Sequence, residues 1–216
     1  MSASGLNRGL YAVTDAQLLP DDRIVEAVEA ALTGGAVLIQ YRDKSSTDTQ
    51  RHAIAASLRD CCHNHGRPLI INDDPQLARR VGADGVHLGD DDLPIGEARR
   101  LLGPEALIGR SCHGSLAAGE AAAAEGASYL AFGRFFSSQT KAGAPGAEPS
   151  VLTQAAALGL PRVAIGGITV DNAPELIDAG ADLVAVVHGL FSADDIEARA
   201  REFTRLFHQR LSGEQL

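Results

Sequence analysis

Two basic side chains and an amide occupy alternate positions in the segment Gln40-Tyr41-Arg42-Asp43-Lys44, where an apolar run ends. Side chains alternate along a strand, so those of Gln40, Arg42 and Lys44 are expected to point the same way. Arginine offers a bidentate fork for phosphate oxygens, and lysine offers a point charge. The segment therefore predicts a clamp for a diphosphate group. The alternative is a surface ion pair between one of these cations and a neighbouring aspartate.

Acidic side chains follow the next two apolar runs, Asp73 and Asp74 after one, and Asp90, Asp91 and Asp92 after the other. Carboxylates brought close together repel one another unless a cation lies between them. Mg²⁺ takes one or two carboxylates together with phosphate oxygens and water. These residues predict a Mg²⁺ site beside the clamp. An aspartate before a proline also commonly starts a helix, which accounts for Asp74 and is an alternative for Asp92, but does not account for Asp73.

The segment 133–145 is the longest loop between an apolar run and a helical stretch. Its hydroxyls and its two cations suit phosphate binding, and long loops in compact domains are often functional, so a closing lid is predicted. Gly167 and Gly189 follow the last two apolar runs. In barrels, backbone N–H groups at these positions commonly hold a phosphate.

Three other clusters are given no catalytic role. The cysteines and histidines of segment 61–65 lie at a helix end and lack the spacing of a zinc site. Cys112 and His113 are consecutive, so on a strand they would face opposite ways and form no nucleophile–base pair. His87 is expected to be a packed or rim histidine and not a base.

The polar residues named above follow apolar runs that predict strands. The runs are nearly continuous in apolar residues, as parallel strands buried on both faces require. The predicted strands are Leu10–Val13, Val37–Tyr41, Pro68–Ile71, Gly85–Leu88, Ala106–Ile108, Tyr129–Phe132, Arg162–Ile165 and Leu183–Val187. Between them, helices are predicted over Asp22–Thr33, Thr47–Asn64, Ser115–Glu125 and Ser192–Leu211, the last with Ser192 as N-cap and a carboxylate at N3.

Alternating strands and helices without a linker predict an α/β fold, a single-domain (β/α)8 TIM barrel over residues 1–216 with a flexible N-terminus at residues 1–8. An open doubly wound sheet is the alternative. In a barrel, the loops that follow the strands share one rim, where active sites are built. The clamp, the carboxylates and the glycine turns should therefore meet in one site.

Composition and charge exclude several partners. The net charge of −9 argues against nucleic acid. No apolar run approaches the roughly 20 residues that span a bilayer, and the start lacks the apolar stretch of a signal peptide. The 3 cysteines show no paired spacing and suit a reducing compartment. We expect a cytoplasmic protein with small-molecule substrates and no membrane partner. A homo-oligomer is compatible with the sequence.

Along nearly its whole length the sequence resembles the thiamine-phosphate synthase family. The motifs that carry the resemblance stand in the family's order and are specific in combination. They are Gly9-Leu10-Tyr11-Ala12-Val13-Thr14-Asp15, Gln40-Tyr41-Arg42-Asp43-Lys44, Ile70-Ile71-Asn72-Asp73-Asp74, Gly82-Ala83-Asp84-Gly85-Val86-His87-Leu88-Gly89, Thr140-Lys141 and Ala164-Ile165-Gly166-Gly167-Ile168.

The resemblance implies a Mg²⁺-dependent transferase. Its substrates would be 4-amino-2-methyl-5-(diphosphomethyl)pyrimidine and 4-methyl-5-(2-phosphoethyl)thiazole, or the carboxylated thiazole. They would give thiamine phosphate and pyrophosphate, the diphosphate leaving first. By the same resemblance, Asp73 and Asp92 would bind the metal, and the catalytic residues would be Arg42, Lys44, Ser111 and Lys141. The substrate-binding residues would be Gln40, Arg42, Lys44, Asn72, Ser111, Ser138, Thr140, Lys141, Gly167, Val187 and His188.

Two other functions are alternatives. A related thiazole tautomerase on the same barrel binds thiazole phosphate without a metal, but it has no diphosphate to hold, so the presence of Arg42, Lys44 and Asp73 argues against it. A sensor would bind thiamine phosphates without turnover, and no additional interaction domain supports it. His188 departs from the family pattern, since serine is common there.

Overall fold

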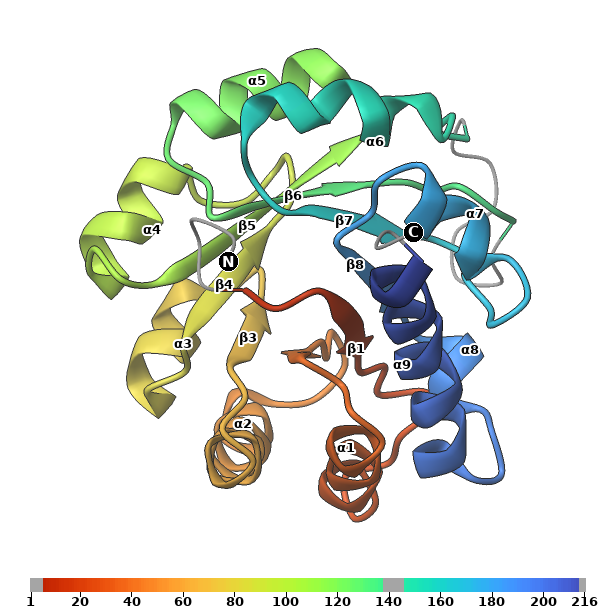
Figure 1. Ribbon diagram of the computed structural model, residues 1–216. Coiled ribbons are helices and arrows are strands. Elements are labelled where there is room, and N and C mark those ends of the chain that lie inside the picture. Colours follow the sequence, from red (N-terminus) through yellow and green to blue (C-terminus); the bar gives the residue numbers. More distant parts are fainter. Residues whose placement is uncertain (1–5, 138–145, 214–216) are drawn as a thin grey trace.

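The structure is a computed structural model that describes residues 6–137 and 146–213. Within these residues, eight parallel strands form a closed barrel in sequence order, surrounded by helices (Figure 1). The closure is made by β8 (Leu183–Val186), which pairs with β1 (Gly9–Val13). The predicted single-domain (β/α)8 barrel is therefore confirmed, and the alternative of an open sheet is wrong, because an open sheet would leave these two edges unpaired.

The remaining strands are β2 (Leu38–Tyr41), β3 (Leu69–Asn72), β4 (Gly85–Leu88), β5 (Leu107–His113), β6 (Tyr129–Phe132) and β7 (Arg162–Ile165). The helices are α1 (Ile24–Thr33), α2 (Asp48–Asn64), α3 (Pro75–Val81), α4 (Ile95–Leu102), α5 (Leu116–Ala124), α6 (Ser150–Gln154), the 3₁₀ helix η1 (Ala155–Leu158), α7 (Ala173–Asp178), α8 (His188–Phe191) and α9 (Ile196–Gly213). Apart from the fifth, the predicted strands agree with these bounds to within one residue at each end.

Strand alternation divides the buried side chains into two cores. Outward-facing strand residues pack against the helices, as Ile39 and Ile71 do. Inward-facing residues fill the barrel, among them Tyr11, Leu38 and Tyr129. Because successive side chains point to opposite faces, the inward set continues at the carboxyl ends of the strands as polar residues that open toward the rim.

Two predicted element boundaries are wrong by more than two residues. The fifth strand was expected to end at Ile108, but β5 continues to His113. Its polar residues resemble a loop in the sequence, yet Ser111 pairs with β6, and a register shift follows it. The last helix was expected to start at Ser192. Instead α9 begins at Ile196, because the Asp195 carboxylate accepts the N–H of Ala198 (2.8 Å) and caps the helix.

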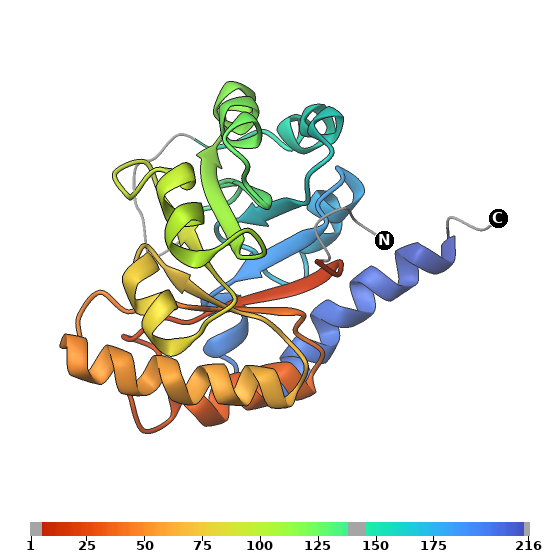
Figure 2. The ribbon, with the colours of Figure 1, turned by 90° about the vertical axis from the view of Figure 1, so that its left-hand side faces the viewer.

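The two ends of the barrel differ. The start of β1 and the C-terminal part of α9 lie on one side, and α9 projects past the barrel there (Figure 2). Of the predicted flexible N-terminus, residues 1–5 lie outside the described part of the chain, Leu6 packs into the inner core, and Arg8 pairs with Asp182 at 3.6 Å. None of the helices among the described residues has the length and apolar character needed to cross a membrane.

Candidate active site

A hollow of about 320 Å³ lies at the carboxyl ends of β2 and β3. We call it the cup. Parallel strands place the residues that follow them on one rim, which is why segments distant in the sequence meet here. The cup contains members of both the predicted clamp and the predicted metal site. Its lining residues are Asp43, Lys44, Arg51, Asn72, Asp73, Asp74 and Pro75.

The two cations of the clamp are held by carboxylates from other loops. Arg42 lies 3.5 Å from Asp15, which is 5% exposed and follows β1. The backbone N–H of Arg42 donates to the Thr14 hydroxyl at 2.9 Å. The Lys44 ammonium lies 2.9 Å from Asp73. The alternative ion pairs with a neighbouring aspartate are not the ones formed. Asp15 follows an apolar run like the other rim residues, and that position was the available signal for its role.

Asp43 orients the loop that carries these cations, a role that the sequence did not indicate. Its Oδ1 accepts hydrogen bonds from the Ser45 N–H (2.8 Å), the Ser45 hydroxyl (3.0 Å) and the Ser46 N–H (3.0 Å). Its Oδ2 accepts one from the Tyr41 hydroxyl at 3.1 Å. Burial alone would raise the pKa of Asp43, but these hydrogen bonds outweigh it and hold the pKa well below its usual value. The carboxylate therefore fixes the chain on both sides of the clamp.

The predicted metal ligands Asp73 and Asp92 face one another at the ends of β3 and β4. Burial by itself would raise the pKa of Asp73, but Lys44 and the interaction with Asp92 lower it below its ordinary value. Burial raises the pKa of Asp92, and the adjacent Asp73 charge adds to this against the Gly89 N–H, which donates to Asp92 at 2.6 Å. The two neighbouring carboxyl groups therefore differ, with the pKa of Asp73 lowered and that of Asp92 raised.

Helix capping, the alternative role of the acidic residues, holds for Asp74 but not for Asp92. Asp74 caps α3, since its Oδ1 accepts the Leu77 N–H at 2.8 Å, as predicted. Asp92 does not cap α4, whose N-cap is Pro94 without a side-chain hydrogen bond. Asp73 has a left-handed backbone, with φ of 62°. A non-glycine residue in this region is strained, and such strain is typical of functional positions.

The pair Asp73 and Asp92 fits a hard divalent cation. The described residues contain no group of three or more His, Cys, Asp or Glu side chains arranged around one point. Two carboxylates would leave most of a six-coordinate shell to water and to substrate phosphates, which is the coordination that Mg²⁺ favours over a closed protein cage. Burial and the adjacent Asp73 raise the pKa of Asp92, and a cation between the two carboxylates would offset their repulsion.

Inside the barrel, five polar side chains form a continuous hydrogen-bonded chain. The contacts are Gln40 Nε2 to Tyr11 Oη (2.6 Å), Tyr11 Oη to Tyr129 Oη (2.8 Å), Tyr129 Oη to His87 Nδ1 (3.1 Å) and His87 Nε2 to Ser111 Oγ (2.9 Å). We call it the interior chain. It joins two predicted substrate-binding residues, Gln40 on β2 and Ser111 on β5.

His87 is a packed histidine, as predicted. It is 8% exposed, and its ring stacks on Tyr129 with centroids 5.7 Å apart. Burial lowers the pKa of His87 to about 4, against an opposing effect of Asp73, so the imidazole is neutral at physiological pH. The roles of Tyr11 and Tyr129 were missed, because a tyrosine within an apolar run is not distinguishable in the sequence from any other core aromatic.

The interior chain also explains why residue 109 on β5 is a glycine. A side chain there would collide with the ring and hydroxyl of Tyr129. The position therefore needs glycine for space, although its backbone is that of an ordinary strand. The sequence gives no signal for this contact, because the two residues meet across neighbouring strands.

The remaining predicted residues lie at the far side of the rim. Gly167 follows β7, Val187 follows β8, and His188 starts α8. A side chain at Gly167 would meet the carbonyl oxygens of Phe136 and Ser137, so the start of segment 133–145 packs against this turn. Ser138, Thr140, Lys141 and the rest of the predicted lid to residue 145 lie outside the described residues.

The clusters without an assigned role are occupied by structural contacts. In segment 61–65, His63 pairs with Asp84 at 2.9 Å and His65 contacts the Cys61 carbonyl. Cys112 is buried, and burial raises its pKa to about 11. His113 instead is exposed and pairs with Asp90 at 3.0 Å. Cys112 and His113 face opposite ways, as predicted.

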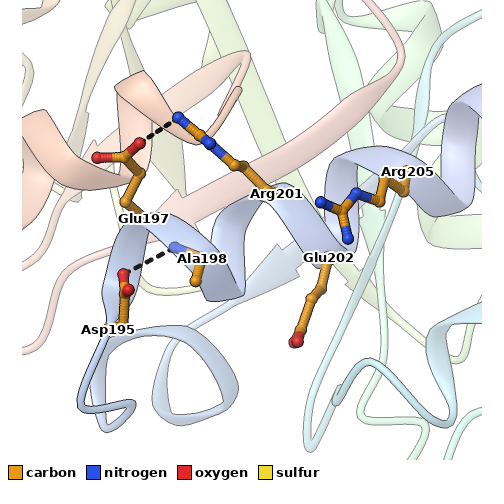
Figure 3. A pocket seen from close by; sticks show the side chains of 6 residues that line it. All are labelled: Asp195, Glu197, Ala198, Arg201, Glu202 and Arg205. Carbon is orange, nitrogen blue, oxygen red and sulfur yellow. Dashed lines mark hydrogen bonds and ion pairs between the residues drawn. The ribbon is translucent and has the colours of Figure 1, made fainter.

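A second hollow, of about 310 Å³, lies along the outer surface of α9 (Figure 3). Its charged side chains belong to one helix. Glu197 pairs with Arg201 four residues on, and Asp195 caps the helix. Such exposed pairs within a helix are ordinary surface features of small energetic value. This hollow contains none of the predicted site residues.

Comparison with known proteins points to one family. Residues 10–190 match the family described as thiamine monophosphate synthase. A thiamine-phosphate synthase of Marinobacter nauticus is 59% identical over 206 residues, covering 94% of this chain and 93% of that protein. One of Alcanivorax borkumensis is 51% identical over 208 residues, covering 94% and 96%. The solved thiamine phosphate pyrophosphorylase of Pyrococcus furiosus is 33% identical, with a TM-score of 0.85 and coverage of 94% and 96%.

Proposed function

The chain belongs to the thiamine-phosphate synthase family, and on that premise we propose that its cup makes thiamine phosphate. The reaction joins 4-amino-2-methyl-5-(diphosphomethyl)pyrimidine to 4-methyl-5-(2-phosphoethyl)thiazole, or its carboxylated form, and releases pyrophosphate. The observation that carries the proposal is the meeting of a clamp cation and a predicted metal ligand in one hollow, with Lys44 2.9 Å from Asp73. A tautomerase needs neither group, and a sensor needs no means to stabilise a leaving group.

In this proposal Arg42 and Lys44 hold the diphosphate. Their present partners, Asp15 and Asp73, hold the two side chains in position. Charge grows on the diphosphate as its bond to the methylene carbon breaks and the electron pair leaves with oxygen. Cations already in position stabilise that charge without reorganising, which is the main source of catalysis in such sites. Lys141 would add a third cation from segment 133–145.

Asp73 and Asp92 would hold Mg²⁺ beside the clamp. When bound, the ion supplies positive charge to the departing diphosphate. Asp73 would exchange its contact with Lys44 for the cation, which frees the ammonium for a phosphate oxygen. With the cation bound, the repulsion between the two carboxylates would be offset.

The thiazole phosphate would bind at the far side of the same rim, at Gly167, Val187 and His188, with Ser138 and Thr140 from the segment 133–145. The thiazole nitrogen would capture the pyrimidine methylene cation with its lone pair, so that no general base is needed. Asn72, Gln40 and Ser111 would hold the pyrimidine ring. A cytoplasmic location and a homo-oligomeric state, both expected from the sequence, stay predictions.

The test is a pyrophosphate-release assay with both substrates, with and without Mg²⁺. We expect release only when both substrates and the metal are present, with thiamine phosphate formed in equal amount. Asp73→Asn should lower kcat by about 100-fold or more and weaken the dependence on Mg²⁺, because the neutral amide would bind less tightly the cation that stabilises the leaving group. Release without the thiazole phosphate, or a wild-type rate in Asp73→Asn, would contradict the proposal.

A further inference from the structure

Arg51 lines the cup together with Lys44, and no role was predicted for it. It lies near the start of α2, and its side chain is 22% exposed. Its Nη2 lies 3.1 Å from the Asp74 carboxylate, and its Nη1 lies 3.5 Å from that of Asp48. Both terminal nitrogens therefore face carboxylates, so the positive charge of Arg51 is engaged within the protein and is not held free for an anion.

Asp74 uses both of its carboxylate oxygens. Its Oδ1 accepts the N–H of Leu77 and caps α3, while its Oδ2 accepts a hydrogen bond from Arg51. Capping needs only one oxygen, so the contact with Arg51 is additional to the cap. Asp74 thereby connects the start of α3 to α2, and these two helices lie side by side on the outside of the barrel (Figure 1).

The residue before Asp74 is the strained metal-ligand candidate Asp73, with φ of 62°. The backbone is held on both sides of the strain, since Asp73 N–H donates to the His87 carbonyl and Asp74 N–H donates to the Asn72 carbonyl, each at 2.8 Å. A left-handed non-glycine residue persists only where its surroundings hold it. The contact between Arg51 and the Asp74 side chain restrains the turn from the side of the helices.

Arg51 occupies this position at a cost to itself. Its Nε is buried and has no hydrogen-bond partner among the described residues. A buried donor without a partner is unfavourable, and in a native structure it indicates that another requirement fixes the side chain. The contact with Asp74 is the part-buried one of its two ion pairs, because Asp48 is 86% exposed. The restraint on Asp74 is therefore the requirement that the structure offers.

We propose that Arg51 is a positioning residue that acts through Asp74 to hold the turn at Asp73, and so presents the Asp73 carboxylate to the divalent cation. The proposal rests on the metal site of the proposed function. With only two carboxylates as protein ligands, binding of the cation depends strongly on the orientation of each. Partners that orient a metal ligand typically contribute about 10-fold to 100-fold in metal affinity.

The sign of the effect separates positioning from simple electrostatics. Arg51 is a cation close to the site, so removal of its charge alone would reduce the repulsion of a divalent cation and tighten binding. Positioning predicts the opposite, since the Asp73 carboxylate would lose its fixed orientation. A role confined to the stability of the fold would leave the metal affinity of the folded variant unchanged.

The experiment titrates Mn²⁺ into the substrate-free protein and measures free Mn²⁺ by its electron paramagnetic resonance signal. Arg51→Met keeps the apolar stem without the charge and should raise the dissociation constant by about 10-fold. Asp48→Asn is the matched control, because it breaks the other ion pair of the same guanidinium, and it should change the constant by less than about twofold. If Arg51→Met does not fold, Arg51→Gln makes the same test and should weaken binding by a similar factor.

A double-mutant cycle tests the route through Asp74. Asp74→Asn keeps an N-cap for α3 but removes the carboxylate that pairs with Arg51. In this background Arg51→Met should cost less than about twofold in Mn²⁺ affinity. Additive losses would overturn the proposal, as would unchanged or tighter binding of Mn²⁺ by Arg51→Met. Those results with normal Mn²⁺ binding by the wild type would refute only the positioning, whereas absence of Mn²⁺ binding by the wild type would refute the metal site and this proposal with it.

Discussion

Replacing Asp43 by asparagine should destabilise the protein by about 2 kcal/mol near neutral pH. The carboxylate accepts four hydrogen bonds, from Ser45 twice, from Ser46 and from Tyr41. Hydrogen bonds to a charged acceptor contribute roughly 1.5–3 kcal/mol each, against about 1 for neutral ones. The amide keeps an oxygen for the serines, whose groups water can also reach, and loses the acceptor for the buried Tyr41 hydroxyl. The expected loss of about 2 kcal/mol is therefore smaller than the sum of the contributions of the four hydrogen bonds.

The cost should depend on pH in a specific direction. The pKa of Asp43 is lower in the folded protein than its ordinary value of 3.8, so the unfolded chain binds the proton first as the pH falls. Stability from this carboxylate is thus fully present above about pH 5 and is lost as the pH falls below about 4.

Urea denaturation of the wild type and Asp43→Asn between pH 3 and pH 8 measures this. The difference in unfolding free energy should be constant at the upper end and shrink at the lower end. Asp60→Asn is the control, since Asp60 is 67% exposed and forms an ion pair with the adjacent Arg59, and it should change stability by less than about 0.5 kcal/mol. A difference between the wild type and Asp43→Asn that does not change with pH would refute the reasoning.

Two further substitutions test the clamp and the inner core. Arg42→Ala should raise the KM for the pyrimidine diphosphate by about 10-fold to 100-fold and that for the thiazole phosphate by much less, because a charge-assisted contact to the diphosphate is lost. Steady-state kinetics with each substrate varied in turn would measure this. Equal increases in the two KM values would contradict the clamp. Gly109→Ala should lower stability by about 1–3 kcal/mol, because the new methyl group meets the Tyr129 ring; thermal unfolding would measure it, and an unchanged Tm would show that the ring has room to move.

The sequence was sufficient to predict most of the fold. Nearly continuous apolar runs identify strands that are buried on both faces, and this pattern needs no knowledge of the partners. The Asp74-Pro75 step predicted the start of α3 correctly, since a cap is a local hydrogen bond between residues three apart. The family and its transferase activity were also predicted correctly, because several specific motifs stand in one order.

Local patterns failed where tertiary contacts decided the outcome. The polar end of β5 was taken for a loop, because its pairing with β6, and not an apolar pattern, extends the strand beyond Ile108. The start of α9 was placed too early, since Ser192 and Asp195 are both good N-caps, and the intervening turn after α8 selects Asp195. Neither choice can be made from the segment alone.

What the sequence determined by itself is therefore the set of strands, the order of the units and the chemistry of the rim residues, because these depend on periodicity and on neighbours along the chain. Only the tertiary structure decided which rim residues meet. It paired Arg42 with Asp15 and Lys44 with Asp73, and it joined Gln40 to Ser111 through Tyr11, Tyr129 and His87. These contacts connect different strands of a closed barrel, and closure brings together side chains whose separation in the sequence carries no information about their distance in space.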